Sequence, residues 1–246
     1  MSILKYFDYP TSEEWVELFK NKKQKFNKTE LKIKEIKSVS NMRELSYTEE
    51  LESWIQSYNN RVFDLHVNYV MLKYFYNKGI PDQEWYVSGN KQSVEYHTQF
   101  EEKHTSYHYW FCSYVKGFYT EFTGLIDTLY HLINIKFRYN VKPGLGLRRK
   151  VLRKLKNDDR ELFSIIEGFE NNIVFNKVKD YRNNLIHNYP KMLVSPGITI
   201  TNSPDGQMNY QKNVGEYTTT SEYFVNIEDS VDFLASIVDQ IRMKIT

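Results

Sequence analysis

Apolar residues recur along this chain in alternating steps of three and four positions, the spacing that places them on one side of an α-helix. The first run lies within residues 47–78, and its members are Leu51, Ile55, Tyr58, Val62, Leu65, Tyr69, Leu72 and Tyr76. Ser46 and Glu49 have the spacing of a capping box, while Gly79 and Pro81 predict the end of the helix. The pattern therefore predicts one long helix with an apolar side.

Three more stretches follow the same rhythm and predict helices over roughly residues 95–139, 159–188 and 227–245. The second of these cannot extend far beyond Pro190, and Asn226 is placed to cap the last one. The apolar positions of the 159–188 stretch are Leu162, Ile166, Phe169, Ile173, Tyr181 and Leu185. Four helices, each with one apolar side, predict a four-helix bundle in which these side chains form the core.

Two parts of the chain lie outside this pattern. Within residues 193–225, GITIT and QMNYQ flank the turn SPDG and predict a β-hairpin, and YTTTSEYFV is compatible with a third extended segment. Residues 1–45 are rich in lysine; Thr11 and Glu14 predict a short helix there, whereas TELKIKEIKSV fits a strand or a helix. We expect an all-α fold, with a four-helix bundle over residues 46–246, an N-terminal extension and a β-hairpin insertion before the last helix.

Composition narrows the class of protein. Hydrophobic residues make up 41% of the chain, as in globular proteins, and the net charge of +2 does not by itself predict a partner. The single cysteine, Cys112, excludes an intrachain disulfide and a cysteine metal cluster. The first ten residues lack the apolar stretch of a secretory signal, and no window approaches the length of a membrane span. We therefore expect a cytoplasmic protein without a membrane partner.

One segment has part of the pattern of a metal site. Glu101, His104 and His108 lie on one side of a predicted helix, and Glu-x-x-His is the spacing that di-iron bundles use. Such sites need a second Glu-x-x-His on a facing helix, which this chain lacks, although His97 is an additional candidate ligand. A hydrogen-bonded histidine in the core or at its boundary is the favoured interpretation. We expect no metal and no cofactor, and the sequence leaves the role of these histidines open.

The most basic stretch is KFRYNVKPGLGLRRKVLRKLK. Its cations are Lys136, Arg138, Lys142, Arg148, Arg149, Lys150, Arg153, Lys154 and Lys156, and no acidic residue interrupts them. A solvated helix face is one interpretation, and contact with the phosphates of RNA or of a nucleotide is the other. On the second interpretation the RNA-binding residues are Arg148, Arg149, Lys150, Arg153 and Lys154. The segment PGLG lacks the spacing and the Gly-Lys-Ser/Thr ending of a P-loop.

The strongest candidate for chemistry is the segment DYRNNLIHNYP, in which Arg182 precedes His187 by five positions. Histidine moves protons near neutral pH, and a guanidinium matches phosphate oxygens with two hydrogen bonds. Asn183 lies four residues before His187, so its amide is placed to orient the imidazole. The helix ends directly after His187, which places these polar groups at an end of the bundle that is open to solvent.

Arg-x4-His occurs a second time, between Arg61 and His66, where a helix continues past the histidine. We interpret that copy as a chance match. Five residues turn an ideal helix by about 140° beyond a full turn, so Arg182 and His187 do not share a face. Their convergence requires a distorted helix end or a second chain, and a homodimer with residues 182–189 near its interface is therefore expected.

The bundle and the segment RNNLIH together resemble the HEPN superfamily, helical bundle domains with an Arg-x4–6-His motif near the end of a late helix. The resemblance extends over about residues 46–246 and implies a metal-independent endoribonuclease, with a toxin or defence role, that cleaves RNA as a dimer. It implies that Arg182 and His187 are catalytic, with Asn183 as the polar residue after the arginine. A non-catalytic HEPN module that binds nucleotide, RNA or a protein partner is the alternative, and the long 193–225 insertion favours it.

Tyr189 extends the motif to Arg-x4-His-x-Tyr. In one branch of the HEPN toxins, which are paired with nucleotidyltransferase antitoxins, this tyrosine accepts AMP groups that silence the nuclease. The resemblance therefore implies a modification site at Tyr189 and an antitoxin protein as a partner. Those toxins are much shorter and lack the insertion. Because the chain has 20 tyrosines, the simpler interpretation is that a tyrosine stands at this position by chance.

Overall fold

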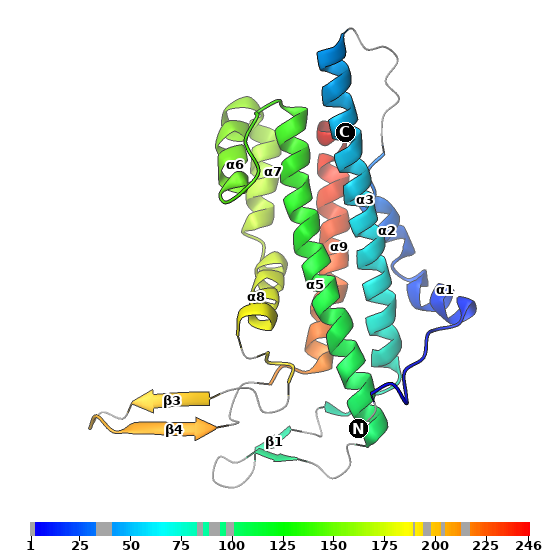
Figure 1. Cartoon of the computed structure of the whole chain (residues 1–246), viewed down its shortest axis with the longest axis vertical. Helices are drawn as coiled ribbons and strands as arrows, with labels where there is room; N and C mark the ends of the chain where they lie inside the picture. Colours follow the sequence, from blue (N-terminus) through cyan, green and yellow to red (C-terminus); the bar gives the residue numbers. More distant parts are fainter. Residues whose placement is uncertain are drawn as a thin grey trace.

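The fold is all-α and is built around three long helices (Figure 1). The computed structural model describes residues 3–32, 41–82, 86–88, 94–96, 101–188, 190–193, 198–202, 205–212 and 217–246. The three are α3 (Met42–Asn77), α5 (Glu102–Lys136) and α9 (Thr220–Ile245), and they lie side by side along the molecule. The apolar sides that the sequence predicts face one another, and the largest fully buried side chains include Tyr58, Tyr69, Phe111, Phe118, Tyr119 and Phe122.

Two short helices of the N-terminal region cover the outside of α3 and α9. The predicted capping box between Thr11 and Glu14 is present at the start of α1 (Ser12–Lys20). The following helix, α2 (Lys23–Thr29), is held against α9 by Lys22, whose amino group lies 2.8 Å from Glu228 and 3.0 Å from Asp232. The part of TELKIKEIKSV from residue 33 onward lies outside the described residues.

The expected helix over residues 159–188 is two helices, so that prediction is wrong in detail. The segment divides into α7 (Arg160–Glu170) and α8 (Ile173–His187), and α7 is preceded by the basic helix α6 (Leu147–Asp158). The Asn172 side chain accepts a hydrogen bond from the backbone N–H of Val174, so it caps the start of α8. Because the chain turns here, Ile173 is 71% exposed and does not take its predicted place in the core.

Three helix starts also differ from the predictions. The first long helix begins at Met42 with Asn41 as its cap, so Ser46 and Glu49 lie inside it and cap nothing. The helix expected from residue 95 begins at Glu102, after a short strand. The last helix begins at Thr220, so most of YTTTSEYFV is helical. Its capping box joins Thr219 to Glu222, and the predicted cap Asn226 is buried inside the helix as the hydrogen-bond acceptor of Tyr119.

Two antiparallel strand pairs lie beside the end of the bundle where α8 ends and α9 begins (Figure 1). The pair β3 (Ile198–Asn202) and β4 (Met208–Lys212) falls in the segment for which a hairpin is predicted, with Ile200 opposite Tyr210. A second pair, β1 (Tyr86–Ser88) and β2 (Val94–Tyr96), has no counterpart in the sequence predictions. Both pairs project from the helices (Figure 1).

Candidate functional site

The helix that carries the motif, α8, is fixed in the bundle by its apolar side. Phe175, Val178 and Leu185 are buried on that side. Tyr181 packs between Tyr119 of α5 and Tyr223 of α9, with ring centroids 5.9 and 4.6 Å away. The polar residues of the last two turns therefore face away from the core in a defined orientation.

Arg182 and His187 meet within a single chain. The guanidinium Nη1 of Arg182 lies 3.5 Å from Nε2 of His187, because the long arginine side chain spans the angle between the two positions. The divergence of the two positions on the helix therefore does not require a second chain, and the reason given above for a dimer is wrong. An arginine only donates hydrogen bonds, so this contact uses the lone pair of an unprotonated Nε2. The His187 side chain is exposed, whereas Arg182 is half-buried.

Asn183 has a different partner from the predicted one. Its side-chain oxygen accepts a hydrogen bond from Nη1 of Arg182 at 3.2 Å, so the amide orients the guanidinium and not the imidazole. Nε of Arg182 is buried and has no hydrogen-bond partner within the described part of the chain. His187 has one polar contact among the described residues, the one with Arg182.

The chain after His187 is fixed to the start of α9. The backbone N–H of Asn188 closes the helix on the carbonyl of Asn184, and the Asn184 side chain accepts from the N–H of Lys191 at 2.9 Å. The carbonyl of Lys191 in turn accepts from the N–H of Thr218 at 2.8 Å, across the base of the insertion. Tyr189 lies outside the described residues. The end of α8 is thus a fixed structure on both sides of that tyrosine.

A buried polar cluster lies behind this turn. His108 hydrogen-bonds to the backbone of Met192, and its Nε2 lies 3.2 Å from the hydroxyl of Tyr217. Burial lowers the pKa of His108 to about 4, so the ring is neutral at physiological pH. The Tyr217 hydroxyl also donates to Asp82, which accepts from the backbone N–H of Thr220 at the start of α9. This cluster joins α5, the turn after the motif and the first residues of α9.

The segment considered as a metal site has two other roles. Nδ1 of His104 accepts from the backbone N–H of Glu101 at 3.2 Å, so these two residues cap the start of α5. His108 belongs to the buried cluster and contacts the Cys112 sulfur. Within the described residues, no group of three or more His, Cys, Asp and Glu side chains is placed to hold a metal ion. His97 lies outside them.

The second Arg-x4-His pair does not form a site. Arg61 donates to Glu121 on α5 at 2.8 Å, whereas the ring of His66 stacks on Phe19 with centroids 3.6 Å apart. Burial lowers the pKa of His66 to about 4. The two side chains thus serve the packing of different elements.

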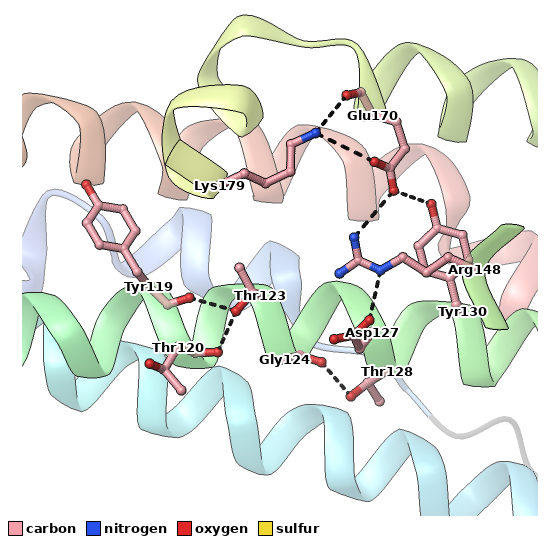
Figure 2. A network of polar contacts seen from close by, with 10 residues as sticks. All are labelled: Tyr119, Thr120, Thr123, Gly124, Asp127, Thr128, Tyr130, Arg148, Glu170 and Lys179. Carbon is pink, nitrogen blue, oxygen red and sulfur yellow. Dashed lines mark hydrogen bonds and ion pairs between the residues drawn. The ribbon is translucent and has the colours of Figure 1, made fainter. Parts of the chain in front are cut away.

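One of the predicted RNA-binding residues, Arg148, is held by acids of its own chain (Figure 2). Its Nε donates to Asp127 at 2.8 Å, and its Nη1 lies 3.8 Å from Glu170. The same carboxylate accepts from the Tyr130 hydroxyl at 2.6 Å and lies 4.0 Å from the amino group of Lys179. This Arg148 network joins α5, α6, α7 and α8, so the side chain has a structural role in addition to any contact with RNA.

The other four predicted RNA-binding residues lie on the solvent side of α6. Val151 and Leu155 bury the opposite side, which leaves the cations exposed; they are Arg149, Lys150, Arg153 and Lys154. None of the four forms an ion pair with an acidic residue in the described part of the chain. The Arg148 network connects this helix to Lys179, which is one helical turn before Arg182.

A hollow that the sequence does not predict lies between α8 and the start of α9. It has a volume of about 450 Å³ and is lined by Lys177 and Tyr181 on one side and by Glu222 and Asp229 on the other. Its two acidic residues disfavour a phosphate. The hollow is therefore not a candidate phosphate site.

Comparison with known proteins gives one match. A family model described as Cthe2314-like HEPN matches residues 54–246, from the fourth turn of α3 to the residue after α9. Searches of curated proteins and of solved structures return no match to this chain. In the described residues, no helix has the length and apolar character needed to cross a bilayer.

Proposed function

The chain belongs to the HEPN family, and we propose that it is a metal-independent endoribonuclease with a toxin or defence role. The observation that supports this proposal most strongly is the contact of Arg182 with His187 at 3.5 Å, at an exposed helix end. The contact brings together a proton acceptor and a cation that binds phosphate oxygens. A closed helix end alone would not require these two groups to meet.

The proposed reaction is attack of an RNA 2′-hydroxyl on the adjacent phosphorus. Nε2 of His187, whose lone pair faces the guanidinium, takes the proton of the hydroxyl. Arg182 then turns its guanidinium from the imidazole to the phosphate and stabilises the charge on the pentavalent phosphorus, while Asn183 orients it. The P–O5′ bond breaks, and the products are a 2′,3′-cyclic phosphate and a 5′-hydroxyl.

The leaving 5′-oxygen needs a proton, and one neutral histidine does not supply both steps. We therefore keep the homodimer as part of the proposal, with His187 of the partner subunit as the acid. Exposed apolar side chains within the motif and shortly after it favour such an interface: Ile186 is 48% exposed and Leu193 is 43% exposed. Light scattering that shows a monomer at micromolar concentration would contradict this part.

The exposed cations of α6 are proposed to hold the RNA backbone. Arg149, Lys150, Arg153 and Lys154 face solvent, and the helix is joined to α8 close to Arg182. Arg148, which is paired with two acids, contributes mainly to the structure. A strand bound along this face would therefore approach the motif from the side of Lys179.

The test of the activity is cleavage of single-stranded RNA in EDTA by the wild type and by two variants. His187→Ala and Arg182→Ala are each expected to lose at least about 10²-fold, as for a lost acid–base group or a lost charge-stabilising group. Wild-type protein that leaves RNA intact in EDTA, while folded and dimeric, would contradict the proposal.

A non-catalytic HEPN module is the second candidate. It is favoured by His187 having one polar contact among the described residues, the one with Arg182, and by Asn183 bonding Arg182 and not the imidazole. Such a module would bind RNA, nucleotide or a protein partner through the same surface. RNA binding that is equal in the wild type and in His187→Ala, with no cleavage by either, would support this candidate.

We further propose that Tyr189 accepts AMP groups from an antitoxin nucleotidyltransferase. This proposal rests on the extended motif, and Tyr189 itself lies outside the described residues. Added phosphates near Arg182 would occupy the position of the substrate phosphate and repel RNA. Intact-mass measurement of protein co-expressed with its genomic neighbours should show AMP-sized increments that vanish in Tyr189→Phe. An unmodified mass beside a co-expressed nucleotidyltransferase would contradict it.

A further inference from the structure

A second candidate site lies at the other end of the bundle, where α3 begins and α5 ends (Figure 1). A groove of about 240 Å³ opens there, and its lining includes Tyr47, Trp54, His131, Arg138, Asn140 and Lys142. Tyr119 of α5 contacts Tyr181 of α8, so Tyr119 shows where along α5 the helix with the motif packs. His131 is twelve residues further along α5, or about 18 Å at 1.5 Å per residue, so the groove is separate from the motif.

A parallel ring stack forms one wall of the groove. The indole of Trp54 and the imidazole of His131 lie 4.1 Å apart with an angle of 6° between their planes. Both side chains are only half-buried, so the stack borders the open groove. Flat aromatic surfaces of this kind bind the faces of nucleobases in proteins that hold single-stranded RNA.

The opposite wall is a backbone turn held in an unusual conformation. Arg138 and Asn140 have φ angles of 54° and 55°, in the left-handed region that residues other than glycine seldom adopt. The side chain of Asn134 fixes the turn, since it donates to the carbonyl of Val141 and accepts from its N–H, both at 3.0 Å. Conformations of this kind cluster at ligand sites, where the surrounding structure maintains them.

The groove carries charge of both signs: Arg138 and Lys142 are cations of its lining, and Glu50 is an acidic residue of its lining. Lys142 is exposed and has no acidic partner among the described residues, whereas Arg138 lies over the Tyr47 ring and is paired with Glu44. Beyond the turn, the amino group of Lys154 on α6 lies 5.7 Å from the ring centre of Tyr139. This contact places one cation of α6 beside the turn that borders the groove.

We propose that this groove binds a single nucleobase, which stacks beside Trp54 while its phosphate contacts Lys142. The side chains of Asn140 and Glu50, which also lines the groove, are placed to accept hydrogen bonds from the amino group of a base. The volume is below the roughly 300–1,000 Å³ of pockets for larger ligands, which fits one ring system and not a folded cofactor. The base can come from a free mononucleotide or from an unpaired position of an RNA strand on α6.

The test is calorimetric titration in a His187→Ala background, so that RNA remains intact and the result does not depend on cleavage. The ligands are AMP, UMP, ribose 5-phosphate and a short unstructured RNA. The variants are Trp54→Leu and Lys142→Gln, with Phe63→Leu as a matched control because Phe63 is an exposed aromatic residue of the same helix. Thermal melting of each variant reports whether it is folded.

Trp54→Leu should weaken binding of the base-containing ligands by about 5- to 100-fold, the range for one lost stacking contact, and Phe63→Leu should leave it unchanged. Lys142 is exposed, so Lys142→Gln should not affect folding; it should weaken binding by about threefold, at low salt only. If AMP and UMP bind, the base in the groove can come from a free nucleotide. If only the RNA binds, the base comes from an RNA strand. Ribose 5-phosphate that binds as tightly as AMP, or a folded Trp54→Leu variant with wild-type affinity, would overturn the proposal.

Discussion

The two Arg-x4-His pairs of this chain have the same spacing but entirely different surroundings. Arg61 and His66 lie in the middle of α3, where the arginine pairs with Glu121 and the histidine is enclosed by Trp15, Phe19 and Phe26. Arg182 and His187 lie in the last two turns of α8, and their side chains contact each other. The same five-residue spacing thus gives two packing residues in one place and a candidate site in the other.

The difference shows what a short motif needs from the fold. In the middle of α3, Arg61 faces α5 and His66 faces α1 and α2, so each of these two side chains has its partner on another element. At the end of α8 the His187 side chain is exposed, and its polar contact among the described residues is with Arg182. A motif of two residues therefore acquires a chemical meaning from its exposure and from the end of the helix.

The largest expected effect separates the two arginines. Arg182→Ala should lower the rate of RNA cleavage by at least about 10²-fold, because the phosphate loses its charged hydrogen-bond donor. Arg61→Ala should keep the cleavage rate, since its partner Glu121 belongs to the packing of α3 on α5. Single-turnover rates of the two purified variants make the comparison. A similar loss in both would mean that the motif has no special role.

The two histidines should also differ in their effect on the free energy of unfolding: replacing His66 should lower it, and replacing His187 should not. His66→Ala removes a ring stacked on Phe19 at the junction of α1, α2 and α3, and we expect a loss of about 2 kcal/mol. His187→Ala removes an exposed side chain and should change the free energy by no more than about 0.5 kcal/mol. Urea unfolding followed by circular dichroism would measure both. Equal stability of the two variants would show that His66 has no special role in the packing of α3.

Neutralising the exposed cations of α6 should affect binding and not the chemical step. The triple variant Arg149→Gln, Lys150→Gln and Arg153→Gln is expected to bind RNA about tenfold more weakly and to show a flatter salt dependence. Arg148→Gln instead should lower the melting temperature, because it removes the cation that pairs with Asp127 and leaves Glu170 with Lys179 alone. Titration at several salt concentrations, with melting curves beside it, distinguishes these outcomes. An unchanged salt slope in the triple variant would contradict the assignment of this surface.

The smallest effect is on the pH dependence of stability. Burial lowers the pKa of His66 to about 4 in the folded chain, against about 6.5 when unfolded, so the unfolded state binds more protons between these values. Stability that is present above pH 6.5 is therefore lost as the pH falls toward 4. Since the residue is only half-buried, we expect its share at pH 5 to be about 1 kcal/mol. The free energy of unfolding of His66→Phe should therefore fall by about 1 kcal/mol less than that of the wild type between pH 7 and pH 5. The same pH dependence in both proteins would contradict this prediction.

Several features of the fold follow from local sequence, and others require the tertiary structure. The helical rhythm of Leu51 to Tyr76 locates α3, and the Thr11–Glu14 pair locates the start of α1. The turn at Asn172 was missed because the apolar spacing continues through it, although Ile173 is exposed. The start of α9 was missed because Thr219 and Glu222 stand in a segment whose β-branched residues also favour a strand.

The candidate site shows the same division. Its two main residues can be identified from spacing and from the predicted end of the helix. The partners of Asn183 and Arg148 cannot, because the first depends on a side-chain conformation and the second on acids 21 and 22 residues away. The groove at Trp54 and His131 is likewise absent from any local pattern, since the two residues are brought together only by the packing of α3 on α5.

The central claim is that the contact between Arg182 and His187 is catalytic. The most direct measurement is cleavage of one labelled single-stranded RNA in EDTA by the wild type, His187→Ala and His66→Ala, each shown to be folded at the assay temperature. We predict that the wild type and His66→Ala cut the RNA at similar rates and that His187→Ala is at least about 10²-fold slower. Equal rates in His187→Ala and His66→Ala would contradict the claim.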